Sequence, residues 1–339
     1  MMRIITSVFT SLLLFINAVN VLAQEKEAIF KRGGGQFEYT GYAPLKNKPI
    51  TVFYYIPSKG DIKTMKVLFS MHGAERSGQL QRGVWRNIAE EYGFIVIAPQ
   101  FAHNNGYLEN DYQFGGVSET KKEFILKPEK AWTYKIIEPL FDYFKERTGN
   151  QSTTYDMFGH SAGGQFVHRY LLMTPEARIG KAVAANPGNY TYPDDKGLYM
   201  PSGKSADAPN WPFSFKDTPF ATDKRLAAYF KRKMVILIGA NDTATVDIDK
   251  SPGADLVLIQ GINRHERAFK YFVFCQATAK KKGMEFNWRL VEVPEAAHSS
   301  AQMVYGRSTV RNWRIENDER VYNNKDLTDL GAFKILVKE

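Results

Sequence analysis

Residues 153–172 of this chain read TTYDMFGHSAGGQFVHRYLL, and this stretch decides the fold. Its first six residues are rich in β-formers and predict a strand, whereas the residues after the second glycine predict a helix. Between them lies the G-x-S-x-G sequence of residues 159–163, with Ser161 at its centre. Strand, motif and helix together predict a tight turn that holds the serine hydroxyl above a sheet edge. Glycines suit such a turn because a strained residue tolerates only small neighbours.

Strand-like and helix-like segments alternate on both sides of this turn. Apolar runs rich in β-branched and aromatic residues predict strands over 36–42, 50–56, 65–71, 94–98, 181–185, 234–238 and 288–293. Helical spacing of apolar residues predicts helices over 80–92, 130–147, 263–281 and from residue 299 onward. This alternation predicts an α/β fold, a mostly parallel, doubly wound sheet that helices cover on both faces.

The first 23 residues have the features of a secretory signal peptide. Arg3 precedes an apolar run from Ile4 to Val19, and Val21 and Ala23 are the small residues of a cleavage site. The run is short and contains Thr, Ser and Asn, which favours cleavage over a membrane anchor. We therefore expect an exported protein, periplasmic or extracellular, with no stable membrane insertion after cleavage.

The rest of the chain is expected to form one domain. Residues 24–35 end in three glycines and predict a flexible lead-in, and residues 36–339 follow as a single unit. Residues 187–219 are rich in Pro, Gly, Tyr and Asp without periodicity, which is typical of a cap inserted between core elements. The end of the chain, 323–339, has no clear pattern, although its apolar stretch 333–337 can pack back on the domain.

Composition excludes several classes of protein. A single cysteine, Cys275, allows no intrachain disulfide, and no Cys/His spacing predicts a metal site. The net charge of +9 is consistent with solvated basic faces, or with attraction to an acidic polymer outside the cell such as a uronic-acid polysaccharide. Nucleic acid is a poor fit for an exported protein with this motif.

A serine hydroxyl needs a base to remove its proton and a third group to orient that base. In a parallel sheet the carboxyl ends of the strands meet at one edge, so the partners are expected after strands, in the order serine, acid, histidine. Asp242 and His298 each follow a predicted strand in this order, and Asp247 and Asp249 are rival acids. Ser161, Asp242 and His298 are therefore the predicted catalytic residues.

The reaction also needs N–H donors for an oxyanion. The backbone N–H of Ala162 lies at the start of the helix after the serine, and a second donor is predicted in the loop after strand 65–71, at Ala74.

Trp85 can stack on a sugar or phenolic ring, although it is equally consistent with a helix core. Substrate contacts are predicted from His72, His160, Trp85, Tyr190 and Trp211.

Together these motifs resemble those of the α/β-hydrolase superfamily over residues 36–315. The resemblance is carried by residues 71–73 (MHG), 159–164 (GHSAGG), 239–242 (GAND) and 297–299 (AHS). The chain is most similar to the exported esterases grouped with polyhydroxybutyrate depolymerases and feruloyl esterases, with some likeness to dienelactone-hydrolase-like enzymes. This resemblance implies a Ser161–His298–Asp242 triad that acts through an acyl-enzyme without a cofactor. Secreted members of that group often carry disulfides, which this chain cannot form.

We therefore expect an exported serine esterase that removes acetyl, methyl or feruloyl substituents from a polysaccharide, either acidic or acylated. The nearest alternative is a polyester depolymerase of the polyhydroxybutyrate type, with the same triad and a more apolar groove. A serine peptidase is less favoured, because the usual extra specificity domain is missing. A non-catalytic glycan-binding protein on a hydrolase fold is the alternative from another class.

Overall fold

A computed structural model describes residues 30–120, 123–197, 210–245 and 254–339. In this part of the chain, eight strands form one sheet in the order β1-β2-β4-β3-β5-β6-β7-β8. Their bounds are β1 Gly33–Tyr39, β2 Ile50–Ile56, β3 Val67–Met71, β4 Ile95–Gln100, β5 Tyr155–His160, β6 Ile179–Ala185, β7 Lys233–Gly239 and β8 Arg289–Val293. Strands β3 to β8 are parallel, β2 is antiparallel to β4, and β1 is antiparallel to β2. The predicted α/β fold is confirmed.

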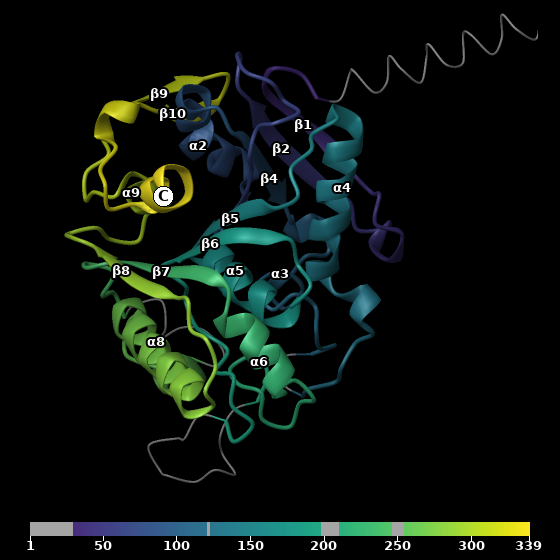
Figure 1. Ribbon diagram of the computed structural model, residues 1–339, viewed down its shortest axis with the longest axis vertical. Coiled ribbons are helices and arrows are strands. Elements are labelled where there is room, and N and C mark those ends of the chain that lie inside the picture. Colours follow the sequence, from purple (N-terminus) through teal and green to yellow (C-terminus); the bar gives the residue numbers. More distant parts are fainter. Residues whose placement is uncertain (1–29, 121–122, 198–209, 246–253) are drawn as a thin grey trace, which may run out of the picture.

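Helices cover both faces of the sheet (Figure 1). Helices α2 and α9 lie on one side of it, and α4, α5, α6 and α8 lie on the other. Their bounds are α2 Gly78–Tyr92, α3 Glu109–Tyr112, α4 Ile137–Thr148, α5 Ala162–Met173, α6 Asp223–Phe230, α7 Ala254–Leu258, α8 Arg264–Lys281 and α9 Ser300–Tyr305.

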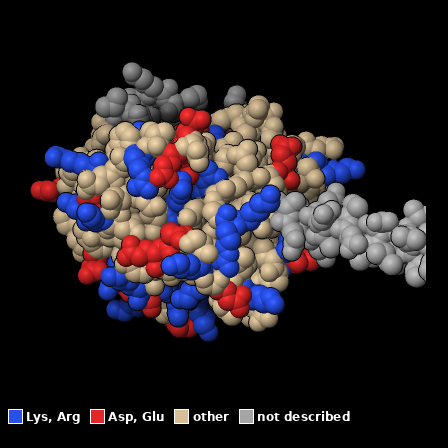
Figure 2. Space-filling model, turned by 90° about the horizontal axis from the view of Figure 1, so that it is seen from above, with Lys and Arg blue, Asp and Glu red and all other residues tan. Residues whose placement is uncertain are grey.

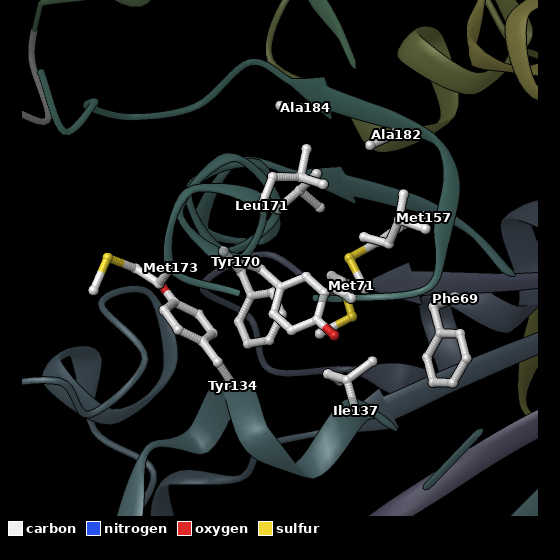
Figure 3. Close-up of a cluster of buried hydrophobic side chains, with 14 of the residues drawn as sticks. Phe69, Met71, Tyr134, Ile137, Met157, Tyr170, Leu171, Met173, Ala182 and Ala184 are labelled. Atoms are coloured by element: carbon white, nitrogen blue, oxygen red, sulfur yellow. The ribbon is translucent and has the colours of Figure 1, made fainter. Parts of the chain in front are cut away.

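The central strands are apolar on both faces because alternate side chains enter two separate cores. In β3, Phe69 and Met71 face the core under α4 and α5, whereas Leu68 faces the core under α2. Figure 3 shows side chains of β3, β5 and β6 meeting those of α4 and α5, among them Met157 and Tyr170. Burial on both faces accounts for the continuous apolar runs in the sequence.

The prediction of a flexible lead-in over residues 24–35 is wrong for its last three residues. Gly33, Gly34 and Gly35 form the first half of β1 and pair with the end of β2. A methyl group on Gly35 would lie 2.3 Å from the ring of Tyr54, so the missing side chain makes room for this tyrosine. Glycine runs suggest flexibility only where no neighbouring strand pairs with them.

The predicted helix over residues 130–147 is only partly correct. Short 3₁₀ turns occupy Glu129–Ala131 and Thr133–Ile136, and the α-helix α4 begins at Ile137. Pro139 therefore lies in the first turn of α4, where its missing N–H is not needed. Further inside a helix its ring would clash with the carbonyl four residues earlier, so the α-helix does not extend back to residue 130.

The predicted cap, residues 187–219, connects β6 to α6, and its residues 198–209 lie outside the described part of the chain. Where it is described, the cap has no helix and no strand longer than the isolated bridge between Tyr192 and Ser214. Even so, this part of the cap is buried against α5 and α8, with Tyr190 stacked on Tyr271 of α8 at 4.3 Å.

Both ends of the chain bear on the sequence predictions. The predicted signal peptide lies outside the described residues, and no described helix is long and apolar enough to cross a membrane.

A hairpin of β9 (Trp313–Glu316) and β10 (Glu319–Tyr322) was not predicted. After it, Phe333 and Leu336 are buried in the core beneath α2 and α9, so the expected packing of residues 333–337 is confirmed.

Candidate active site

Ser161 occupies the turn between β5 and α5. Its backbone angles, φ 58° and ψ −115°, lie in a region that residues with a side chain rarely adopt. The Ser161 N–H donates to the carbonyl of Ala185 at the end of β6 (2.9 Å), which anchors the turn to the neighbouring strand. The turn therefore has the geometry of a nucleophile elbow.

His298 and Asp242 lie beside this serine. His298 Nε2 is 2.9 Å from Ser161 Oγ, and His298 Nδ1 is 2.7 Å from Asp242 Oδ2. A carboxylate can only accept, so Nδ1 carries the proton and Nε2 is left to accept the serine hydroxyl. Asp242 is 1% exposed, whereas His298 is exposed at the surface. The rival acids Asp247 and Asp249 lie outside the described residues.

Asn186 connects the loops that carry the acid and the histidine. Its Oδ1 accepts from the N–H of Gly239 at the end of β7 (2.9 Å), and its Nδ2 donates to the carbonyl of Ala297 (3.2 Å). Ala297 directly precedes His298. One side chain at the end of β6 therefore fixes the two loops relative to each other.

The start of α8 lies against the acid. Arg264 Nη1 is 3.4 Å from Asp242 Oδ1, and the N–H of His265 donates to the backbone carbonyl of Asp242 (3.3 Å). The guanidinium and the helix N-terminus both place positive potential beside this carboxylate.

His160 packs on the histidine of this group rather than facing solvent. Its ring centroid is 4.6 Å from that of His298, and the residue is 6% exposed. Burial, together with the nearby His298 and Arg264, lowers the pKa of His160 well below its ordinary value, so its ring is neutral. Little of His160 is accessible, so the structure gives no support to the predicted contact with substrate.

The loop after β3 presents the Ala74 N–H. The carbonyl of the same peptide unit, Gly73 O, accepts from His72 Nδ1 (2.9 Å) and from the Arg76 N–H (3.2 Å). In a trans peptide the N–H points away from the carbonyl, so these two bonds direct the Ala74 N–H to the opposite side. Ala74 is exposed, and the N–H of Ala162 at the first position of α5 has no intrahelical partner.

His72 is fully buried and ties two loops together. Its Nε2 accepts the N–H of Phe101, just after β4 (3.0 Å), while its Nδ1 donates to Gly73. Burial lowers the pKa of His72 to about 3, so the imidazole is neutral, with the one donor and one acceptor that these bonds need. The prediction that His72 binds substrate is wrong, because no part of it is accessible.

Comparison with known proteins places this geometry in a family. No family model matches the sequence, and no curated protein matches it. Among solved structures, poly(aspartic acid) hydrolase-1 from Sphingomonas sp. KT-1 is 34% identical, with a TM-score of 0.70; the match covers 80% of this chain and 96% of that one. A poly(3-hydroxybutyrate) depolymerase from Bordetella parapertussis is 27% identical, with a TM-score of 0.70, over 80% of this chain and 86% of that one.

The chain belongs to the α/β-hydrolase superfamily. It is an enzyme, a serine hydrolase of the esterase class. The fold, the elbow geometry and the strand order of this α/β-hydrolase agree with that membership.

The aromatic residues predicted to contact substrate are core residues of the α/β-hydrolase. Trp85 is fully buried on α2, with its ring 5.4 Å from that of Phe158 in β5. Tyr190 is fully buried against α8, and Trp211 is 2% exposed beside Phe220. These three predictions are wrong, because helix and loop packing removes the rings from the surface.

Sequence reasoning missed the roles of Asn186 and Arg264. Asn186 follows β6 directly, so its place at the carboxyl edge of the sheet was a usable signal. No local feature of the sequence marks Arg264, because its contact with Asp242 depends on how α8 packs against the rest of the domain. Among the described residues no group of three or more His, Cys, Asp or Glu side chains forms a metal site.

Proposed function

We propose that this α/β-hydrolase is an exported enzyme that cleaves the ester bonds of a polyester through an acyl-enzyme on Ser161. The observation that carries the proposal is the continuous hydrogen-bonded chain from Ser161 Oγ through His298 to the buried carboxylate of Asp242. This arrangement has the parts that nucleophilic acyl transfer needs: nucleophile, base and orienting acid.

In the first half-reaction Ser161 Oγ attacks the ester carbonyl and its proton passes to His298 Nε2. Asp242 stabilises the resulting imidazolium through Nδ1, and the carbonyl oxygen, now negative, accepts from the N–H groups of Ala162 and Ala74. Collapse of the tetrahedral intermediate breaks the bond to the alkoxy group, which leaves as an alcohol with the proton from His298.

In the second half-reaction water attacks the acyl-enzyme. His298 Nε2 removes a proton from the water, and the oxyanion returns to the same two N–H groups. The bond to Ser161 Oγ then breaks, the serine recovers its proton from His298, and the carboxylic acid leaves. Each ester bond that is cleaved consumes one water and yields one alcohol and one carboxylic acid.

An open site and the relatives favour a polymer backbone as the substrate. His298 and Ala74 are exposed, so among the described residues the two sides of the serine are open to an extended chain. The 27% identical relative is a poly(3-hydroxybutyrate) depolymerase. Stacking on sugar rings loses its support, because Trp85, Tyr190 and Trp211 are buried.

Esters of an acidic polysaccharide are the second candidate, because the chain carries a net charge of +9. On the face that Figure 2 shows, basic side chains lie among acidic ones. Several basic residues are paired, such as Lys282 with Asp223 (2.6 Å) and Lys231 with Glu285 (3.6 Å). Such pairing weakens the attraction for a polyanion, which is why this substrate ranks second.

The test compares wild type with Ser161→Ala, His298→Ala and Asp242→Asn, and with Ser58→Ala as an exposed serine outside the triad. We expect fluorophosphonate labelling and hydrolysis of a short p-nitrophenyl ester to fall by about 10⁴-fold or more in the triad variants and to stay unchanged in Ser58→Ala. Equal rates in wild type and Ser161→Ala would refute the proposal.

Substrate is then identified by the product released in a Ser161-dependent manner. Hydroxy acid from poly(3-hydroxybutyrate) supports the polyester, whereas acetate, methanol or ferulate from acidic glycans supports the second candidate. Poly(aspartic acid) is included because the 34% identical relative is a hydrolase of that polymer. Export is tested separately: mass spectrometry of the protein outside the cytoplasm is expected to find Gln24 as the first residue.

A further inference from the structure

The loop that carries Ala74 receives a hydrogen bond from a residue far along the chain. Tyr112, the last residue of α3, donates its hydroxyl proton to the carbonyl oxygen of His72, with 2.7 Å between the oxygens. Both side chains are fully buried. Since α3 lies in the connection between β4 and α4, this bond joins a separate segment to the loop after β3.

Packing sets the position of the Tyr112 ring. It stacks on the imidazole of His72 (centroids 4.3 Å apart, planes at 24°), and the Arg76 guanidinium lies 4.5 Å from its centroid. The rings of Phe101 and Phe166 contact it as well, each at 5.3 Å. These contacts hold the ring and do not involve its hydroxyl. Removing only the oxygen is therefore expected to leave the ring in place.

Two consecutive peptide units of the loop are thereby anchored. In the first, Tyr112 holds the His72 carbonyl, and the Gly73 N–H on the other side donates to Glu75 Oε1 (2.9 Å). In the second, the Gly73 carbonyl is held by His72 Nδ1 and by the Arg76 N–H. Among the described residues, the N–H of Ala74 has no acceptor.

We propose that Tyr112 is a positioning residue: by fixing the His72–Gly73 peptide it aims the Ala74 N–H at the oxyanion. This inference rests on the proposed function, since the oxyanion exists only if Ser161 attacks a carbonyl. Without the hydroxyl, the His72 carbonyl loses its buried donor, and among the described residues the peptide keeps only the bond from the Gly73 N–H to Glu75. An oxyanion donor acts mainly in the transition state, so misalignment lowers kcat more than it changes KM.

Tyr107 provides a matched control. It is also fully buried, its ring lies 5.1 Å from that of Phe101, and its hydroxyl donates to a backbone carbonyl, that of Lys48 (2.6 Å). Tyr112→Phe and Tyr107→Phe therefore each delete one buried hydroxyl bonded to one carbonyl. Only the first of these carbonyls belongs to the loop that carries Ala74.

The experiment measures kcat and KM for a short p-nitrophenyl ester, and the affinity of a boronic acid whose tetrahedral adduct places an oxygen in the oxyanion position. We expect Tyr112→Phe to lower kcat by about 10- to 100-fold and to weaken boronic acid binding by a similar factor, with KM within about 2-fold. Tyr107→Phe is expected to keep all three values, and thermal unfolding is followed to compare the stability cost of the two variants.

Equal kinetics in Tyr112→Phe and Tyr107→Phe would overturn the inference, as would a rise in KM with kcat unchanged. Ser161→Ala in the same assay separates this failure from failure of the proposed function. If turnover depends on Ser161 but not on the Tyr112 hydroxyl, the proposed function stands and the positioning role is refuted. If turnover does not depend on Ser161, both are refuted, because no oxyanion forms at this site.

Discussion

At Gly163 the elbow helix touches the strand beside it. A methyl group here would lie 2.2 Å from the carbonyl oxygen of Met71 and 2.7 Å from that of His72. Both atoms are backbone, at the end of β3 and the start of the Ala74 loop, so they cannot rotate away. The second glycine of the motif thus lets α5, which begins next to Ser161, lie directly against the end of β3 and the start of the Ala74 loop.

We predict that Gly163→Ala lowers the free energy of unfolding by about 1–3 kcal/mol or more, because the added methyl forces α5 away from β3. Urea unfolding measures the change. The matched control is Gly34→Ala, where a methyl group would meet only the Arg82 guanidinium at 3.5 Å, an ordinary contact. If the two variants are equally stable, the contact with β3 does not constrain the elbow.

Around Ser161 the sequence was most informative for residues that directly follow a strand. Ser161, Asp242 and His298 were predicted from strand order, and the structure brings all three side chains together. Their catalytic roles stay predictions until they are tested. The predicted substrate contacts of His72 and His160 gain no support, since His72 is fully buried and His160 nearly so. Strand order says which loop a residue occupies but not whether its side chain faces solvent.

At the scale of elements, α5 and the described part of the cap are joined by one buried cation. Arg169 is fully buried on α5, and among described residues its side chain donates only to uncharged acceptors. These are Thr191 Oγ1 (2.7 Å), Asn189 Oδ1 (2.6 Å), Gln165 Oε1 (3.2 Å) and Pro212 O (3.3 Å). Burial lowers the pKa of Arg169 to about 10, so it remains charged at neutral pH.

We predict that Arg169→Met destabilises the protein by about 2–4 kcal/mol, because buried acceptors of the cap lose their donor. Removal of the desolvated charge offsets part of this cost. Urea unfolding is the measurement, and Lys224→Met, at an exposed lysine of α6, is the control. An Arg169→Met protein as stable as wild type would mean that the cap is held by its aromatic contacts alone.

Elements were predicted well where they are long and regular. The strands of the parallel sheet and the helices α2 and α8 follow from apolar runs and helical spacing. The start of α4 was misplaced because Pro139 and the 3₁₀ turns before it interrupt a pattern that looks helical. The hairpin β9–β10 was missed because each strand has only four residues, and β9 is mostly exposed, which leaves little apolar alternation to detect.

At the scale of the whole molecule, three buried histidines link stability to pH. The pKa of His72 is lowered to about 3, and burial lowers those of His160 and His168 well below the ordinary value. In the unfolded chain each histidine takes up a proton near pH 6.5. The unfolded state therefore binds more protons below that pH, and the folded state becomes less stable as the pH falls.

We predict that the free energy of unfolding declines from pH 6.5 toward pH 4, with each buried histidine contributing about 1 kcal/mol per pH unit. His168→Gln is expected to flatten this decline, since His168 is buried on α5 and, within the described part of the chain, is bonded only to backbone groups, the Gly164 carbonyl and the Thr191 N–H. His103→Gln, at an exposed histidine, is the control. A pH dependence that is the same in both variants would contradict the linkage.

The order of strands and helices, the elbow at Ser161 and the candidates Asp242 and His298 were determined by the sequence itself, because periodicity, turn chemistry and chain order are local properties. Only the tertiary structure decided which side chains reach solvent and which loops touch. From the sequence, Tyr190 is a candidate substrate contact and Trp85 is equally consistent with substrate stacking and with a helix core, and packing from distant elements buries both. The contacts of Tyr112 with His72 and of Arg264 with Asp242 likewise depend on how separate segments dock, which no local pattern encodes.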